Sequence, residues 1–365
     1  MDIIDQFQFE DVGKRLEDLE TPVPVIDIDV VDRNIRKWQA RCGQLGIANR
    51  PHIKTHKLVP LARHQIACGA QGITVQKLGE AEVMADAGIR DMLLTFNAVG
   101  RPKLERLAEL MKRTDITVVA DNAEMLEGLS WAAQQAGRPL TVLVECDTGA
   151  HRNGVQSPEA AAQLGQQIAR TPGLTFGGLM TYAKTGTRQA AHDWLMAARD
   201  LLTGSGLPCP VITTGGSPDM WLDEGLAGIT EYRAGTYIYA DRSLAERGIF
   251  SYDDCALSVL ATVVSTPTGD RAMLDAGSKS LTSDLLGLTG YGVVRELGFA
   301  RIYDMSEEHG FLDISKTNHK PHVGDLVRIT PNHVCPVTNL FDRVVFVRGN
   351  EVLGAVRVDA RGTVQ

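Results

Sequence analysis

The chain has 365 residues, of which 44% are hydrophobic and 22% are charged, and its formal net charge is -8 at pH 7. This composition is typical of a globular protein, and the length exceeds one ordinary domain, so we expect a large domain and a smaller one. The acidic balance argues against a nucleic-acid partner, and no apolar run approaches the roughly 20 residues that span a bilayer, which argues against a membrane partner.

The N-terminal segment "MDIIDQFQFEDVGKRLEDLE" is acidic and has no apolar stretch of the kind found in a signal peptide. Six cysteines are scattered along the chain, and no two of them form a CxxC pair. In a chain of this length that pattern predicts reduced thiols and a cytoplasmic protein.

Short β-rich runs alternate with helical patterns from residue 50 to residue 235. The predicted strands are "RPHIK" at 50–54, followed by 72–77, 91–96, 116–121, 141–147, 175–182, 210–216 and 229–235. A helical pattern follows every strand but the last, and Ser157 with Pro158 forms an N-cap and first-turn pair for one of these helices. Eight such repeats in about 200 residues predict a parallel (β/α)8 barrel of the TIM type rather than an open doubly wound sheet.

The residue pattern changes beyond about residue 245, where runs of β-branched residues are separated by glycine and proline. This pattern predicts a second, mainly antiparallel β domain. We therefore expect an α/β chain with the barrel over residues 20–244 and the β domain over residues 245–365. The early run "TPVPVIDIDVVDRNI" is expected to pair with the β domain, and residues 1–19 to pack on it.

Lys54 lies at the end of the first predicted strand, between His52 and His56. Because the active site of such barrels forms at the C-terminal ends of the strands, its ammonium is expected at the barrel mouth. There it is either a solvated charge or a partly desolvated amine that is suited to a Schiff base. On an extended strand both histidines would share the side of Lys54, although a histidine near a turn is more often an ordinary polar residue.

A glycine-containing turn follows the seventh predicted strand, and Pro218 opens a short helix after it. Backbone amides at such a turn suit a phosphate, and phosphate sites of barrels commonly form after strands seven and eight, although a Gly-Gly turn alone is weak support. The candidate residues of the two turns are Thr214, Gly215, Gly216, Ser217, Arg233, Gly235, Thr236 and Tyr237. A phosphate site and a lysine at one barrel mouth together indicate pyridoxal phosphate.

Several stretches, in a consistent order, resemble the fold-type III pyridoxal-phosphate enzymes: "RPHIKTHK", "GITVQKLGEAEVMADAGIRDMLL", "VECDTGAHRNGV", "TTGGS" and "EYRAGTY". The sequence resembles in particular the D-threonine aldolase and D-serine dehydratase group, which is related to alanine racemase. The resemblance implies that Lys54 is the Schiff-base lysine and that Arg152 lies near the phenolic oxygen of the cofactor. It also implies that Tyr182 belongs to the catalytic and cofactor-binding set. Finally, it implies a homodimer whose sites lie at the subunit interface.

His333 and Cys335 alternate within "TPNHVCPVTNLFD", so on an extended segment both side chains would face one way. Two such ligands can hold a metal and leave its other positions open, although an HxC pair is more often a buried thiol beside an incidental histidine. In the lyases that the sequence resembles, such a pair holds a divalent ion at the 3-hydroxyl of the substrate. A thiolate favours zinc, with manganese or magnesium as alternatives.

The sequence departs from the resembled pattern at two positions. Tyr182 is followed by Ala183, where D-threonine aldolases are expected to carry a histidine base, and His151, Lys184, His56 or a metal-bound hydroxide could replace it. Arg233 matches the arginine that alanine racemases place at the pyridine nitrogen, where a cation weakens the electron sink. Without the resemblance, Arg233 would be a salt-bridge residue at the barrel mouth.

These patterns predict a lyase that depends on pyridoxal phosphate and a divalent metal and acts on D-3-hydroxy amino acids. Retro-aldol cleavage to glycine and an aldehyde is the leading reaction. Dehydration of D-serine or another D-3-hydroxy amino acid, to a 2-oxo acid and ammonia, is the alternative. An amino-acid racemase, which Arg233 favours, and a non-catalytic pyridoxal-phosphate carrier stay open as well. Such carriers have neither a second domain nor a metal pair.

Overall fold

The structure, a computed structural model, describes residues 2–223 and 225–365. Contacts within the chain divide it into two compact units. The β unit comprises residues 2–37, 55–64 and 236–362, and the barrel unit comprises Trp38–Lys54, Gln65–Gly235 and Thr363–Gln365. These bounds differ from the predicted domains 20–244 and 245–365, because the β unit also takes in the N-terminal residues and a short segment after Lys54.

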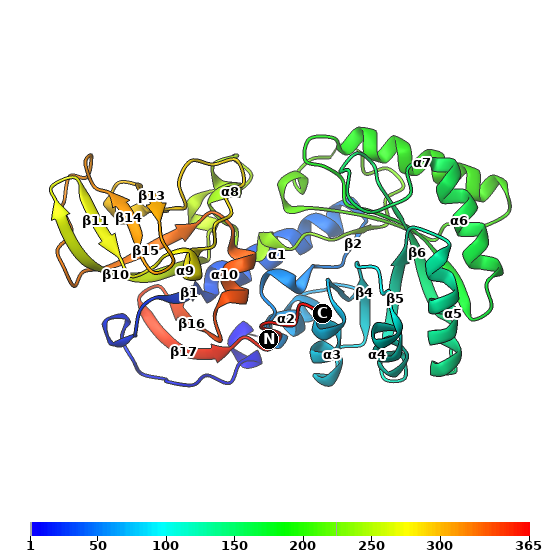
Figure 1. Ribbon diagram of the computed structural model, residues 1–365, viewed down its shortest axis with the longest axis horizontal. Coiled ribbons are helices and arrows are strands. Elements are labelled where there is room, and N and C mark those ends of the chain that lie inside the picture. Colours follow the sequence, from blue (N-terminus) through cyan, green and yellow to red (C-terminus); the bar gives the residue numbers. More distant parts are fainter. Residues whose placement is uncertain (1, 224) are drawn as a thin grey trace. The chain divides into compact units, whose positions relative to one another are not determined.

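The barrel unit contains an eight-stranded parallel sheet in the order β2-β9-β8-β7-β6-β5-β4-β3 (Figure 1). Its strands are β2 Ala48–Asn49, β3 Ile73–Val75, β4 Asp91–Leu94, β5 Asp115–Ala120, β6 Leu140–Cys146, β7 Leu174–Thr181, β8 Val211–Thr214 and β9 Glu231–Tyr232. A parallel bridge between His52 and Thr74 links the segment after β2 to β3, so the strand order closes on itself. The predicted α/β barrel is confirmed.

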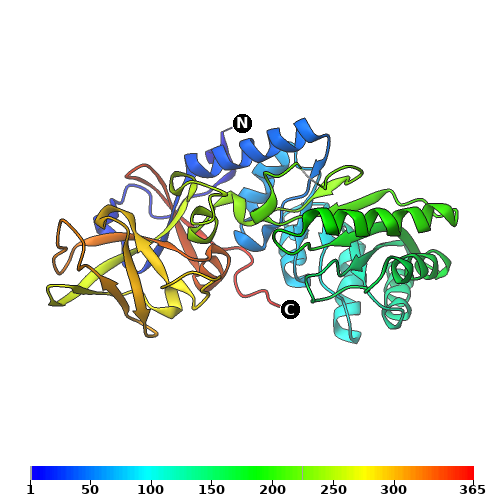
Figure 2. The same ribbon diagram turned by 90° about the horizontal axis from the view of Figure 1, so that it is seen from above.

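Helices follow the successive strands of the barrel unit and cover the outside of its sheet (Figure 1). They are α3 Leu78–Asp86, α4 Arg101–Met111, α5 Glu124–Ala136, α6 Pro158–Arg170 and α7 Arg188–Gly204, while α1 Ile28–Leu45 and α2 Val59–Ala67 include residues of both units. The Ser157 hydroxyl accepts a hydrogen bond from the Ala160 amide at 3.2 Å, which confirms the predicted N-cap of α6. Figure 2 shows α6 and α7 side by side.

The strands of the barrel unit are apolar almost throughout, because both faces of a parallel sheet covered by helices are buried. In β6, for example, Thr141 alone is not fully buried. Leu93, Val119, Leu143 and Met180, from four consecutive strands, form one buried cluster. This packing holds the strands rigidly, so the loops at their C-terminal ends start from defined positions.

The β unit contains a nine-stranded sheet in the order β11-β14-β13-β12-β15-β10-β1-β16-β17, and β10 also pairs with β11. Its strands are β1 Val23–Asp27, β10 Leu257–Thr268, β11 Arg271–Leu274, β12 Gly292–Val294, β13 Ala300–Met305, β14 Gly310–Asp313, β15 Leu326–Pro331, β16 Arg343–Arg348 and β17 Glu351–Arg357. Its short helices include α8 Arg242–Ala245, α9 Ser278–Leu281 and α10 Val334–Leu340. The pairings are antiparallel except that of β1 with β16, as predicted for a mainly antiparallel domain.

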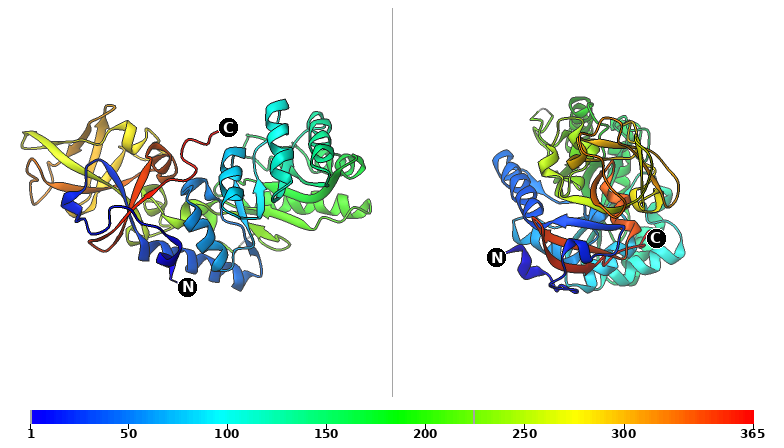
Figure 3. Two further views of the ribbon diagram at one scale, coloured as in Figure 1. Left: turned by 90° about the horizontal axis from the view of Figure 1, so that it is seen from below. Right: turned by 90° about the vertical axis from the view of Figure 1, so that its left-hand side faces the viewer.

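The N-terminal run that contains β1 pairs with β10 and with β16, which both lie more than 200 residues later in the chain (Figure 3). Val25 lies opposite Ser258 of β10 on one side and opposite Val345 of β16 on the other. Glu10 forms a further bridge with Ala355 of β17. The expected pairing of the early run with the β domain is confirmed.

Two other expectations concern the whole chain. Across the described residues, no helix combines the length and the apolar character needed to cross a membrane. The six cysteines all lie within the described part of the chain, and none of them forms a disulfide, in agreement with the predicted reduced thiols.

Candidate active site

The predicted site residues of the barrel unit all follow the C-terminal ends of its strands. Lys54 comes after β2, Arg152 after β6, Tyr182 after β7, the turn 214–217 begins at the end of β8, and Arg233 follows β9. Because the strands are parallel, their carboxyl ends meet at one end of the barrel. The barrel unit therefore brings these residues to one mouth.

Lys54 lies on a short 3-10 turn, Ile53–Thr55, rather than on a strand. The predicted strand "RPHIK" is wrong in this respect, because β2 ends at Asn49 and the chain then turns. The Lys54 side chain is half-buried, and its ammonium has no hydrogen bond or ion pair to any residue among 2–223 and 225–365. A half-buried, uncommitted amine is what a covalently bound aldehyde cofactor requires.

The two histidines beside Lys54 have different surroundings. His52 is buried in the barrel unit, where its Nδ1 accepts from the Lys54 amide at 3.4 Å and its Nε2 lies 3.0 Å from Gln76 Oε1. His56 belongs to the β unit and is fully buried, and its Nδ1 accepts from the Leu58 amide at 3.0 Å. The expectation that both share one side of an extended strand with Lys54 is wrong, because the 3-10 turn intervenes.

The turn after β8, residues 214–217, contains two glycines, so its backbone carries no side chain at these two positions, and we call this turn the cradle. Gly215 has φ +149°, and a Cβ there would lie 2.5 Å from the Arg233 amide nitrogen, so only glycine fits. At Gly216 the nearest atom to a Cβ would be a carbon of the Tyr182 ring, 3.6 Å away. The carbonyl of Gly216 accepts a hydrogen bond from the Tyr232 hydroxyl at 2.9 Å.

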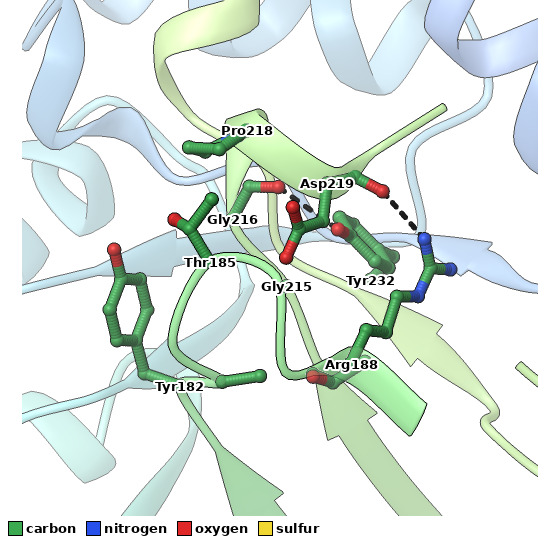
Figure 4. A pocket seen from close by; sticks show the side chains of 10 residues that line it. Tyr182, Thr185, Arg188, Gly215, Gly216, Pro218, Asp219 and Tyr232 are labelled. Carbon is green, nitrogen blue, oxygen red and sulfur yellow. Dashed lines mark hydrogen bonds between the residues drawn. The ribbon is translucent and has the colours of Figure 1, made fainter. Parts of the chain in front are cut away.

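A small, partly open pocket lies beside this cradle (Figure 4). Its lining includes Tyr182, Thr185, Arg188, Thr214, Gly216 and Asp219. Arg188 donates to the Asp219 carbonyl at 2.6 Å, and the Asp219 carboxylate accepts from the Gly186 amide at 3.1 Å. The two glycines and the adjoining hydroxyls fit a small anion such as a phosphate. Sequence reasoning missed that Arg188 lines this pocket, because an arginine at the start of a helix carries no local signal of such a position.

Arg152 and Tyr182 lie together at the mouth. The Arg152 guanidinium is 4.7 Å from the centre of the Tyr182 ring, and both side chains are exposed. Arg152 Nη2 is 4.0 Å from Glu145 Oε1. The structure thus brings together two predicted residues from the loops after β6 and β7.

Glu145 is a buried carboxyl group at the end of β6 that sequence reasoning missed. It is 2% exposed, and its Oε2 has no hydrogen-bond partner among the described residues. Burial raises the pKa of Glu145 to about 7, although the nearby Arg152 opposes this shift. A charged residue inside the apolar run "TVLVECD" was the only signal that could have found it.

Arg233 belongs to a buried polar network inside the barrel unit. It donates to Thr213 Oγ1 and to the Thr181 carbonyl, each at 2.6 Å. Burial lowers the pKa of Arg233 to about 10, although Glu231 and Glu145 oppose this shift. Its hydrogen bonds go to a hydroxyl and a carbonyl, so the alternative of a salt bridge at the barrel mouth does not describe it.

In the β unit, His333 and Cys335 lie at the start of α10. His333, the N-cap residue, has extended backbone, but Cys335 is in the first turn of the helix, so the expectation that the whole segment is extended is wrong. The fold nevertheless brings the two side chains close enough to interact. His333 Nδ1 also lies 2.7 Å from Asp284 Oδ2. Burial lowers the pKa of His333, but Cys335 and Asp284 outweigh it and raise the pKa to about 9.

This pair fits a metal by the chemistry of its donors. An imidazole nitrogen and a thiolate are ligands that zinc prefers. A carboxylate on Nδ1, here from Asp284, orients the ring and leaves Nε2 for an ion. Sequence reasoning missed Asp284, which lies 49 residues from His333 in the chain.

Thr236 and Tyr237 belong to the β unit, although they were predicted with the phosphate cradle. They begin the 3-10 turn Thr236–Ile238, and Tyr237 is fully buried. The Thr236 hydroxyl lies 3.7 Å from Cys335 Sγ. Their role at the cofactor phosphate stays a prediction, as does that of Gly235, the last residue of this stretch of the barrel unit.

The sequence matches a model of the alanine racemase N-terminal domain over residues 26–243, which is more than half of the chain. The chain belongs to the alanine racemase-like family. A second model, named for a serine dehydratase domain, matches residues 256–347. The resemblance inferred from the motifs is therefore confirmed.

Proteins similar to this chain include aldolases and dehydratases of D-amino acids. The chain is 36% identical to a D-threonine aldolase of Arthrobacter sp over 364 residues, which cover 96% of this chain and 95% of that protein. It is 33% identical to the D-threo-3-hydroxyaspartate dehydratase of Delftia sp. over 87% of this chain and 91% of that one.

Solved structures of an aldolase and a dehydratase are also similar to this chain. The D-threonine aldolase of Filomicrobium marinum superposes with a TM-score of 0.89 at 32% identity, covering 98% of this chain and 100% of that chain. A D-threo-3-hydroxyaspartate dehydratase has been solved as a cysteine-to-alanine mutant in a metal-free form, with a TM-score of 0.84 at 31% identity, covering 94% of this chain and 99% of that one.

Proposed function

We propose that this alanine racemase-like protein is a pyridoxal-phosphate-dependent and metal-dependent lyase that cleaves D-3-hydroxy amino acids by a retro-aldol reaction. The products are glycine and an aldehyde. The observation that carries the proposal is the pairing of His333 with Cys335 at the start of α10. A racemase or a cofactor carrier has no need for an imidazole and a thiol held together in its second domain, whereas a lyase that acts at a hydroxyl uses a cation there.

The barrel residues would hold the cofactor. Lys54 would supply the amine that bonds to it and, once released, would return a proton to the second carbon, which glycine needs after the bond to the third carbon has broken. Gly215, Gly216 and Ser217 would cradle the phosphate, with Thr214 beside them, and Arg152 would lie against the phenolic oxygen. Pyridoxal phosphate, when bound, withdraws electrons from the second carbon of the substrate.

The β-unit residues would hold a divalent ion, and zinc fits their donor atoms best. His333 and Cys335 are the proposed ligands, and Asp284 holds the ring of His333 through the 2.7 Å hydrogen bond. The positive charge of an ion stabilises negative charge that develops at the 3-hydroxyl oxygen of a substrate. The residue that takes the proton of that hydroxyl stays open among His151, Lys184 and His56.

Dehydration to a 2-oxo acid and ammonia is the second candidate. It is favoured by the thiol ligand at position 335 and by the similarity to a D-threo-3-hydroxyaspartate dehydratase that was solved metal-free with a cysteine replaced. The same pair of ligands serves either reaction, because in both of them the 3-oxygen gains negative charge.

A product assay tests the proposal. The purified protein, supplied with pyridoxal phosphate and zinc, is incubated with a panel of D-3-hydroxy amino acids and with their L enantiomers. Glycine and an aldehyde from the D forms alone support the aldolase, whereas ammonia and a 2-oxo acid support the dehydratase. Equal action on both enantiomers, with interconversion, would establish a racemase. Cofactor binding without any turnover would establish a carrier.

A further inference from the structure

Thr55 directly follows Lys54 in the same 3-10 turn and contacts the proposed metal ligand Cys335. The two side-chain atoms, Thr55 Oγ1 and Cys335 Sγ, are 3.2 Å apart, although the residues are separated by 280 positions in the chain. Thr55 is fully buried. Within residues 2–223 and 225–365, its hydroxyl has no other hydrogen-bond partner.

The direction of this hydrogen bond depends on the state of the thiol. A hydroxyl can donate or accept, and a neutral thiol can do either weakly. A cysteine that binds a metal is a thiolate and has no proton to give. With a metal bound, the Thr55 hydroxyl is therefore the donor and the sulfur is the acceptor. A buried hydroxyl needs such a partner, and the sulfur at 3.2 Å is the one available.

We propose that Thr55 is a positioning residue that orients the Cys335 sulfur for the metal and links the metal site to the turn that carries Lys54. The inference rests on the proposed function. A hydrogen bond to a ligating sulfur fixes its direction and withdraws some of its electron density, and groups in this position commonly change metal affinity by 10-fold to 100-fold. The Thr236 hydroxyl, at 3.7 Å from the same sulfur, is the longer of the two contacts.

The link to Lys54 has a thermodynamic consequence. Any shift of Cys335 on metal binding acts on Thr55, and through the backbone of the 3-10 turn on the neighbouring lysine. If the metal changes the affinity for pyridoxal phosphate by some factor, the cofactor changes the affinity for the metal by the same factor. This coupling should depend on the Thr55 hydroxyl.

Three variants separate the hydroxyl from the packing of its side chain. Thr55→Val keeps the volume and removes the hydroxyl, and Thr55→Ser restores the hydroxyl. The matched control is Thr338→Val in α10, where the hydroxyl is also fully buried but donates to the Val334 carbonyl at 3.2 Å. Zinc affinity is measured by competition with a chromophoric chelator, using full-length protein that carries its cofactor.

We expect Thr55→Val to weaken zinc binding by about 10-fold or more, Thr55→Ser to stay within about twofold of the wild type, and Thr338→Val to bind as the wild type does. Cobalt provides a spectroscopic readout, since a sulfur relieved of a hydrogen bond donates more strongly to the metal. The sulfur-to-cobalt band should therefore shift to longer wavelength in Thr55→Val and return in Thr55→Ser. A general loosening of the fold would not produce this pattern.

The coupling is measured by titrating pyridoxal phosphate with and without zinc. Zinc should change the cofactor affinity in the wild type and in Thr55→Ser, but not in Thr55→Val. Wild-type zinc affinity and an unshifted cobalt band in Thr55→Val would overturn the inference while leaving the proposed function intact. A wild-type protein that binds neither zinc nor pyridoxal phosphate would overturn the proposed function, and the inference with it.

Discussion

At the scale of single residues, the stretch "KTHK" contains two lysines whose ammonium groups differ in hydrogen bonding. Lys57 is buried, and its ammonium donates to the Ala360 carbonyl at 3.3 Å, whereas Lys54 is half-buried and has no such bond among the described residues. An amine that is already held cannot easily approach an aldehyde. The local structure therefore favours Lys54 as the residue that bonds to the cofactor.

Lys54→Ala should abolish both turnover and the absorbance band of lysine-bound pyridoxal phosphate, because it removes the amine that is proposed to bond to the cofactor. The band is recorded on the purified protein after the addition of cofactor. Borohydride reduction followed by peptide mapping provides the direct check. A pyridoxyl group on Lys57 or another lysine would contradict the assignment.

Glu145 predicts a pH dependence of stability. Burial raises its pKa from 4.5 to about 7 in the folded chain, so the folded state holds the proton more tightly than the unfolded state does. Its contribution to stability is present below about pH 4.5 and is lost as the pH rises towards 7. Glu145→Gln removes this loss. The unfolding free energy of the variant, relative to the wild type, should therefore rise by up to about 3 kcal/mol between about pH 5 and pH 8.

Urea unfolding of cofactor-free protein at the two pH values measures this difference. The control is Glu127→Gln at an exposed position of α5, which should show no comparable change with pH. A difference between Glu145→Gln and the wild type that stays constant with pH would show that the buried carboxyl does not titrate in this range.

At the scale of elements, the turn after β8 depends on Gly215 for its backbone conformation and on Gly216 for the open space beside it. Gly215→Ala would place a Cβ 2.5 Å from the Arg233 amide nitrogen, at φ +149°. We expect it to lower the unfolding free energy by about 2 kcal/mol and to weaken cofactor binding, because the cradle must shift. Gly216→Ala is the matched control for folding, since its Cβ would come no closer than 3.6 Å to the Tyr182 ring.

Thermal unfolding and titration with pyridoxal phosphate distinguish the two glycines. Gly216→Ala should unfold like the wild type but bind the cofactor less tightly, because the new methyl group occupies the cradle. If Gly215→Ala had wild-type stability, the close approach of this turn to the backbone of Arg233 would contribute nothing to the unfolding free energy.

We predict that the residue at position 335, at the start of α10, determines which metal the protein prefers. Cys335→Asp replaces a soft sulfur by a hard oxygen at the same place in the first turn of the helix. The variant should retain a metal site but shift its preference from zinc towards manganese. Elemental analysis after loading with an equimolar mixture of the two ions measures the shift. An unchanged ratio of zinc to manganese would mean that Cys335 is not a ligand.

At the scale of the whole molecule, we propose that the chain forms a homodimer whose sites lie at the subunit interface. The β unit exposes large apolar side chains that a partner could cover. They include Val264, Leu285, Phe299, Tyr303 and Val323. Light scattering should give twice the mass of one chain, and dilution into the monomer range should reduce turnover. A fully active monomer would contradict the proposal.

Seven of the eight barrel strands lie where the alternation of apolar and helical patterns predicted them, and the eighth, β2, lies just before the predicted run. The N-cap at Ser157 and the pairing of β1 were also predictable, because both follow from local signals. The extended geometry expected at Lys54 and across the segment from His333 to Cys335 was wrong. In each case a helical turn begins within a few residues, and a short motif with a proline nearby fits either conformation.

The sequence by itself determined the fold class, the family and the candidates Lys54, Gly215, Gly216, His333 and Cys335, since periodicity and motifs are local properties of the chain. Only the tertiary structure decided which groups surround them. Asp284 lies against His333, Thr55 against Cys335, and Glu145 is buried beside Arg152. The first two contacts join residues separated by 49 and 280 positions. A contact of that kind follows from how strands pair and loops close, and no local pattern records it.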